Sequence, residues 1–193
     1  SDVYKRQTYN RVEDRLDYYY NLEGVRMSCV TEDSAGNLYV GTMNNGLYMI
    51  DHNKKWLNYF PKKDITCIYE DSKKSIWVGT KDDGLFRLDR NGGITNYGTA
   101  PHQNMLSSSY VRCVVEDNLG NYWIGTFKGL DKLDVTTGTF THYSKDNKPY
   151  SLSNSSIICM MKDRQGTFWI GTYYGGVNLF NPDYEIYTYY YPD

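Results

Sequence analysis

The segment VRCVVEDNLGNYWIGTFKGLDKLDVTTGTFTHYS, residues 111–144, is one of four copies of a single pattern. The other three copies begin at Met27, Ile65 and Ile157, so the starts are 38, 46 and 46 residues apart. In every copy a Tyr follows 32 residues after the start. Self-similarity at a spacing of this size indicates an array of repeated structural units.

Each copy is typical of four short strands separated by turns. In residues 111–144 an apolar run ends in Glu-Asp, an Asp-x-x-Gly turn follows, and YWIGT, GLDKLD and FTHY come after it. Asp closes such a turn with its side chain and Gly supplies the positive φ. Lys74 stands at the Gly position of the second copy, so we expect that turn to be strained or of another type. No segment keeps a helical period, and helices are not expected.

The first two strands of each copy are apolar on both faces, so both faces must be covered. Four-stranded antiparallel sheets that stack around an axis provide this cover. We therefore predict an all-β fold made of β-propeller blades, four in number and incomplete as a ring. A flat sandwich is the alternative, but it does not explain four near-identical units.

The repeat starts divide the chain into blades at residues 27–64, 65–110, 111–156 and 157–193, the last truncated after its final strand. Residues 16–26 are predicted to be the end of a preceding blade with its linker. Residues 1–15 are predicted to be a tail, non-native or disordered at 1–7. We therefore expect the chain to be part of a longer array.

Composition excludes several classes of function. The 193 residues carry 21 Lys and Arg against 23 Asp and Glu, a net charge of −2, which gives no reason to expect nucleic-acid binding. Mean hydropathy is −0.66, and no apolar run approaches the length of about 18–20 residues that a spanning helix needs. Aromatic residues make up 16% of the chain, which disfavours disorder.

The copies resemble the two-component regulator propeller repeat. The resemblance rests on the pattern V-x-x-[IV]-x-E-D-x-x-G-x-x-W-[IV]-G-T, then G-L-x-x-[LI]-D and F-x-x-Y, and covers residues 16–193. The linker KDNKPYSLSNSSI, residues 145–157, is also typical of that family. The departures are Tyr39 for Trp, Lys74 for Gly and Lys162 for Glu.

The resemblance implies more than the residues do. Such repeats form seven-bladed propellers in the periplasmic sensor region of hybrid two-component systems, upstream of a membrane helix and a histidine kinase. It implies an oligosaccharide ligand and a non-enzymatic segment without a cofactor. The partners it implies are the remaining blades and downstream sensor domains of the same chain, with a homodimer of the full-length protein.

Residues that recur in every copy are interpreted as structural. Catalytic pairs are not needed four times, so the recurrent Glu-Asp pairs are predicted to build turns. The Cys positions are too widely spaced for a zinc site and are expected to be buried thiols, unlinked because neighbouring sheets lie about 10 Å apart. The three His fall at unrelated positions, so no metal site is predicted. The structural repeat residues are Trp77, Trp123 and Trp169, predicted to pack between blades, Gly41, Gly79, Gly125 and Gly171, and Asp33, Asp71, Asp117 and Asp163.

Function is expected where the copies differ. The linker into the first strand and the turn between the second and third strands lie at one end of a four-stranded meander. Aromatic rings there can stack on sugar rings, and charged groups can bind hydroxyls and uronates. Arg112 is the strongest candidate, because the other copies have Ser28, Thr66 and Ile158 at its position. The candidate ligand-binding residues are Arg112, Tyr110, Tyr173, Tyr174, Phe127, Lys128 and His102; none is predicted to be catalytic.

Two other functions stay open. A propeller enzyme of the streptogramin-lyase type needs a non-repeated cluster of His, Glu and Arg at one end, for which His102 and Arg112 are the visible pieces. A protein-interaction scaffold is the third reading, since propeller ends often bind proteins.

Overall fold

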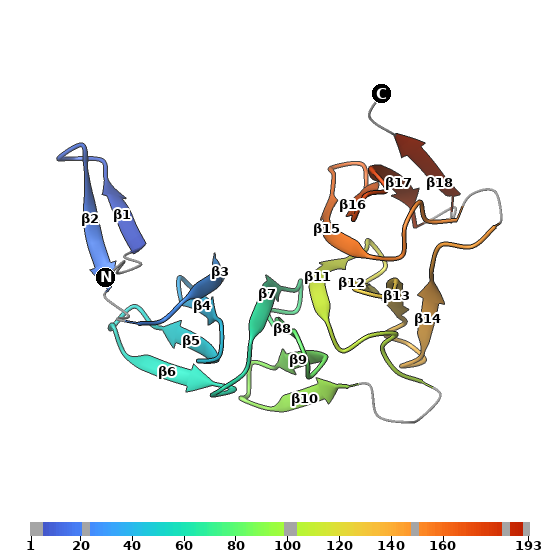
Figure 1. The fold of residues 1–193 in the computed structure, drawn as a ribbon. Coiled ribbons are helices and arrows are strands. Elements are labelled where there is room, and N and C mark those ends of the chain that lie inside the picture. The colour runs from blue at the N-terminus through green and yellow to red at the C-terminus, as the bar shows by residue number, and fades with distance from the viewer. Residues whose placement is uncertain (1–5, 21–23, 99–103, 148–150, 183–185, 191–193) are drawn as a thin grey trace.

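The computed structural model describes residues 6–20, 24–98, 104–147, 151–182 and 186–190. All helices and strands assigned in these residues are β-strands. None of these residues forms a helix that could span a membrane. Four antiparallel sheets of four strands follow one another along an open arc (Figure 1). The predicted all-β fold of propeller blades is confirmed.

Each blade contains four consecutive strands, paired in sequence order. Blade one consists of β3 (Met27–Glu32), β4 (Leu38–Thr42), β5 (Leu47–Ile50) and β6 (Trp56–Tyr59). Blade two consists of β7 (Ile65–Glu70), β8 (Ile76–Thr80), β9 (Leu85–Leu88) and β10 (Ile94–Tyr97). Blade three consists of β11 (Val111–Glu116), β12 (Tyr122–Thr126), β13 (Leu130–Leu133) and β14 (Phe140–Tyr143). Blade four consists of β15 (Ile157–Lys162), β16 (Phe168–Thr172), β17 (Val177–Asn181) and β18 (Ile186–Tyr190).

A separate hairpin precedes blade one. Its strands are β1 (Arg6–Asn10) and β2 (Arg15–Tyr20), which pair antiparallel in a two-stranded sheet. The expectation that residues 1–15 form a tail is therefore wrong for Arg6–Asn10 and Arg15. This hairpin is not a copy of the repeat, so the repeat pattern did not predict it.

The Asp-x-x-Gly turns follow the predicted design. In blade one the Oδ1 atom of Asp33 accepts hydrogen bonds from the backbone N–H groups of Ala35 and Asn37, and Gly36 has a φ of +83°. In blade two Lys74 has a φ of +66° and donates its N–H to Asp71 O at 2.9 Å, as Gly36 does to Asp33 O at 3.0 Å. The turn type is therefore kept, and Lys74 takes a backbone conformation that favours glycine.

The apolar core lies between the blades. Trp77 is fully buried, and its ring centroid is 4.2 Å from that of Tyr122 in the next blade. Trp123 is also fully buried and meets Phe168 of blade four at 5.8 Å. The indole Nε1 of each donates to the turn aspartate of its own blade, Asp71 or Asp117. Inter-blade packing is thus confirmed for these two tryptophans.

Trp169 does not pack between blades in this structure. It donates to Asp163 as its equivalents do, but 39% of its surface is exposed. Among the described residues no blade follows blade four, so the face that Trp123 buries in blade three is open here. The predicted packing of Trp169 between blades is therefore wrong. Burial at this position requires a following blade, which Trp77 and Trp123 have.

The cysteines and the Gly-Thr glycines share these interfaces. A Cβ on Gly125 would lie 2.6 Å from Ile157 Cγ2 of the next blade, so glycine allows the blades to approach closely. All four cysteines are free in the structure. Burial raises the pKa of Cys67 to about 12. Cys159, however, is exposed, and the expectation of four buried thiols is wrong at this position.

Candidate functional site

The first strand of each blade is called the inner strand here. Its start lies beside the turn that follows the Gly-Thr pair of the same blade. In each blade the residue after Thr donates its backbone N–H to the carbonyl of the residue just before the first strand. Eight positions are thereby fixed around the axis at the linker end, and we call them the axial mouth. They are Met43 with Arg26, Lys81 with Asp64, Phe127 with Tyr110, and Tyr173 with Ser156.

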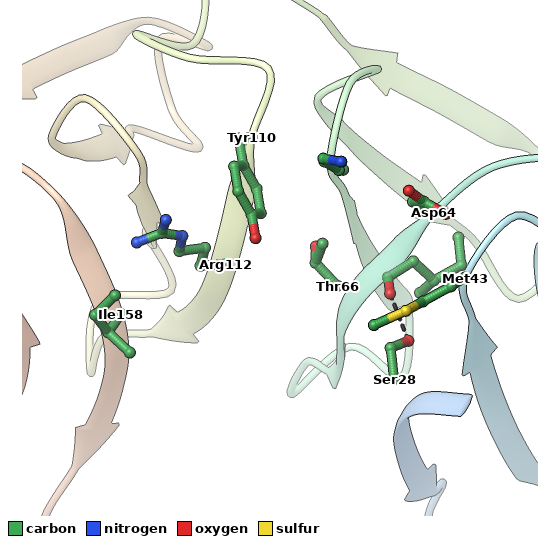
Figure 2. Close-up of a pocket in the computed structure, with 9 residues that line it drawn as sticks. Ser28, Met43, Asp64, Thr66, Tyr110, Arg112 and Ile158 are labelled. Atoms are coloured by element: carbon green, nitrogen blue, oxygen red, sulfur yellow. Dashed lines mark hydrogen bonds between the residues drawn. The ribbon is translucent and has the colours of Figure 1, made fainter. Parts of the chain in front are cut away.

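A cavity of about 500 Å³ lies at the axial mouth. This volume is within the range of about 300–1,000 Å³ that is usual for small-molecule sites. Figure 2 shows Tyr110 and Arg112 of blade three facing Ser28, Met43 and Asp64 across the open space. The lining residues are Ser28, Met43, Asp64, Ile65, Thr66, Lys81, Tyr110, Arg112 and Ile158.

In blades one to three, the second residue of the inner strand links its blade to the next. Ser28 Oγ donates to Ile65 O at 2.5 Å, and Thr66 Oγ1 donates to Val111 O at 2.6 Å. Arg112 makes the equivalent bond, since its guanidinium NH1 group donates to the carbonyl of Ile157 at 3.0 Å. Arg112 therefore has a structural partner as well as a place in the cavity wall.

The Arg112 guanidinium also lies against two aromatic rings. Its central carbon is 4.6 Å from the ring centroid of Tyr110 and 5.3 Å from that of Phe127. The two rings are nearly parallel, at 13° and 6.3 Å. Both separations are within cation–π range. A positive charge beside two aromatic faces is suited to a ligand that carries both C–H surfaces and acidic or hydroxyl oxygens.

A buried carboxylate holds the linker that carries Tyr110. Asp131 Oδ2 accepts hydrogen bonds from Ser107 N at 2.8 Å and Ser107 Oγ at 2.9 Å, and its Oδ1 is 2.8 Å from His142 Nδ1. In blade four Asn178 Oδ1 does the same for Ser153 N at 2.9 Å. Burial raises the pKa of Asp131 above its ordinary value of 3.8, although His142 and Ser107 oppose the shift.

We expect Asp131→Asn to change the pH dependence of stability. Because the folded-state pKa of Asp131 is raised, its protonated form contributes stability that is complete below about pH 3.8 and is lost as pH rises through the raised value. The asparagine keeps an acceptor for Ser107 N, as Asn178 shows. The variant should therefore gain stability relative to the wild type as pH rises through this window. Urea unfolding at a series of pH values measures this, and identical pH slopes would contradict it.

The structure brings together only part of the predicted set. Tyr110, Arg112 and Phe127 form one cluster, in which Tyr110 and Arg112 line the cavity and Phe127 does not. Tyr173 and Tyr174 contact each other, with ring centroids 4.3 Å apart, but neither lines the cavity. Lys128 is exposed and does not line it either. His102 lies outside the described residues.

Two charged residues of the cavity wall were not predicted. Lys81 and Asp64 line the cavity, and the Lys81 side chain has no hydrogen-bond or ion-pair partner among the described residues. The available signal was positional, since Lys81 occupies in blade two the place that Phe127 occupies in blade three. Both residues lie in segments that vary among the copies. A single Lys or Asp in a polar turn, however, cannot be distinguished by sequence from an ordinary surface residue.

The acidic pairs at the opposite end have structural roles. Their Asp residues build turns, as predicted, whereas Glu70 and Glu116 connect neighbouring blades, which was not predicted. Ser34 donates from N and Oγ to the Glu70 carboxylate of the next blade, at 2.8 and 2.7 Å. Ser72 does the same with Glu116, at 2.7 and 2.6 Å. Within the part of the chain that the structure describes, no cluster of three or more His, Cys, Asp or Glu is suited to a metal ion.

Comparison with known families and structures agrees with the repeat pattern. The family model described as the two component regulator propeller matches residues 59–82, 105–128 and 151–174. Each match runs from a linker through the first two strands of a blade. No curated protein matches the chain.

Several solved structures share the fold at low sequence identity. The extracellular domain of a hybrid two component system from B. thetaiotaomicron aligns with a TM-score of 0.73 and 21% identity, over 86% of this chain and 24% of that one. Virginiamycin B lyase from Staphylococcus aureus aligns with a TM-score of 0.72 and 15% identity, over 97% of this chain and 63% of that one. PorZ of the type-IX secretion system of Porphyromonas gingivalis aligns at 0.71 and 14%, over 93% and 30%. The chain thus spans about a quarter to just under two thirds of these relatives, and the likeness shows the fold alone.

Proposed function

We propose that this chain, whose repeats are those of the two-component regulator propeller, is the ligand-sensing propeller segment of a hybrid two-component sensor. In this proposal its ligand is an oligosaccharide and its output is a histidine kinase in the same protein. The segment itself is non-enzymatic, lies in the periplasm, and acts together with further blades and downstream domains. The match of three repeats to the family model supports the sensor assignment.

The observation that carries the ligand assignment is the cluster of Arg112, Tyr110 and Phe127 beside an open cavity of about 500 Å³. Sugar rings present C–H faces that pack on aromatic rings, while their hydroxyl and carboxylate oxygens accept hydrogen bonds from a guanidinium. One guanidinium NH group is held by blade four, at Ser156 Oγ and Ile157 O. Arg112 lines the cavity, and its remaining N–H groups would donate to the ligand.

The repeat itself supplies the variant that tests this. Because Thr66 makes the inter-blade bond with a hydroxyl, Arg112→Thr should keep the connection to Ile157 while it removes the cation. We expect saturable binding of at least one member of an oligosaccharide panel by isothermal titration, and a loss of about tenfold or more in affinity for Arg112→Thr, equal to about 1.4 kcal/mol or more.

The matched control is Arg164→Thr, which removes an exposed arginine from the turn between β15 and β16, at the opposite end of blade four. It should leave affinity unchanged. Near-UV circular dichroism confirms that each protein is folded. A folded protein that binds no member of the panel would overturn the oligosaccharide assignment, and equal losses for both variants would remove Arg112 from the site.

A further inference from the structure

A second cavity lies between blades one and two, at the end opposite the axial mouth. Its volume is about 360 Å³, and we call it the outer groove. Its apolar wall consists of Tyr39, Met49 and Tyr59 from blade one and Ile76 and Leu88 from blade two. Tyr39, Ile76 and Leu88 are buried there. The outer groove therefore has an apolar floor that the fold builds from two sheets.

The same position between blades two and three holds much less space. There the cavity is about 160 Å³, and Trp77, Tyr97, Tyr122 and Leu133 take the places of Tyr39, Tyr59, Ile76 and Leu88. The Trp77 indole fills it, 4.2 Å from the Tyr122 ring and 5.4 Å from the Tyr97 ring. Three equivalent positions differ between the two cavities: Tyr39 replaces Trp77, Ile76 replaces Tyr122 and Met49 replaces Arg87. The first two exchange a large ring for a smaller side chain and so enlarge the outer groove.

From this difference we propose that the outer groove binds a small molecule through a planar aromatic ring of about indole size. Its volume reaches the range of about 300–1,000 Å³ in which ligand pockets fall, whereas that of its counterpart does not. The counterpart shows which occupant the position accommodates, because an indole sits there between two tyrosine rings. Aromatic rings in offset or tilted contact gain about 0.5–1.5 kcal/mol beyond burial.

Polar groups surround the open side of the outer groove. Arg90 and Asp89 are exposed there, and Lys74 Nζ is 3.9 Å from Glu70 Oε1. The Arg90 side chain has no partner among the described residues. The ring would therefore enter the apolar floor, and polar substituents would point outward to these charges. This site is distinct from the axial mouth, and the inference does not depend on the proposed function.

Indole is the probe that tests the outer groove. In ¹H–¹⁵N and methyl spectra of the 193-residue chain, we expect indole to cause saturable shifts at Ile76, Leu88 and Tyr39 and none at the axial mouth. Tyr39→Trp, which restores the residue of the other blades, should weaken indole binding by about tenfold or more. Ile76→Tyr should do the same by filling the groove from the opposite blade. Arg112→Thr, at the axial mouth, should leave it unchanged.

The variants also separate loss of the site from loss of the fold. Tyr39→Trp should raise or keep the melting temperature, because it adds apolar contact at a position where the repeat accepts indole; if it lowers the melting temperature, Ile76→Tyr decides. Absence of saturable shifts in the folded wild type, or shifts that persist in the folded filling variants, would overturn the proposal.

Discussion

Replacing Trp77 by alanine is expected to lower the free energy of unfolding by about 3–5 kcal/mol, the usual cost of removing a large buried aromatic side chain. Trp77 has no exposed surface, contacts Tyr97 and Tyr122, and donates its indole N–H to Asp71 at 2.8 Å. The substitution removes the ring contacts across the interface and leaves a cavity between two blades. It also removes one donor from a buried carboxylate.

The chain contains its own control for this prediction. Trp169 has the same place in its blade and the same bond to a turn aspartate, but it is 39% exposed. Trp169→Ala should therefore cost less than half as much as Trp77→Ala. Urea unfolding followed by far-UV circular dichroism gives both values. Equal losses for the two variants would mean that the inter-blade contacts do not contribute the stability assigned to them here.

The repeat pattern was sufficient to predict the blades because each strand and turn is specified locally. The turn aspartates accept hydrogen bonds from N–H groups two and four residues away, so the structure of the Asp-x-x-Gly turn depends only on residues close in sequence. Even Lys74 keeps the turn, since the flanking strands and Asp71 determine it. The hairpin of β1 and β2 has no second copy in the chain, and repetition gave no help there.

Burial was harder to predict because it depends on a neighbour. Trp123 and Trp169 lie in nearly identical local sequences, YWIGT and FWIGT, yet one is buried and the other is not. The difference lies in whether another blade packs on the face. Cys159 departs from the prediction for the same reason. A repeat pattern predicts which face of a strand is apolar. Whether that face is buried depends on whether a neighbouring blade packs against it.

The candidate site was only partly predicted, again because some of its contacts cross between blades. Arg112 was identifiable because it breaks the pattern Ser28, Thr66 and Ile158. Its bond to Ile157 O was not, since that contact crosses between blades. The outer groove depends on the combined size of Tyr39 and Ile76, which lie 37 residues apart in sequence. Neither substitution alone is unusual. The space that the two together leave is seen only when the two sheets are placed side by side.

The open faces of blades one and four are expected to make the chain self-associate as its concentration rises. Met161 is 59% exposed in blade four, whereas its equivalent in blade three, Val115, is 7% exposed. On blade one Val30 is 50% exposed, whereas its equivalent Val114 is 5% exposed. These side chains belong to surfaces that the inner blades bury against each other, and exposed apolar sheet surface promotes association.

Met161→Lys tests this, with Leu119→Lys as the matched control. Leu119 is 75% exposed, but it lies in the turn between β11 and β12, where its equivalents Ala35 and Lys73 are exposed as well. Burying one methionine side chain contributes about 1.5–3 kcal/mol, so Met161→Lys should weaken association by about tenfold or more, and Leu119→Lys should not. Sedimentation velocity over a range of concentrations measures both. A wild-type chain that remains a monodisperse monomer over this range would contradict the predicted self-association.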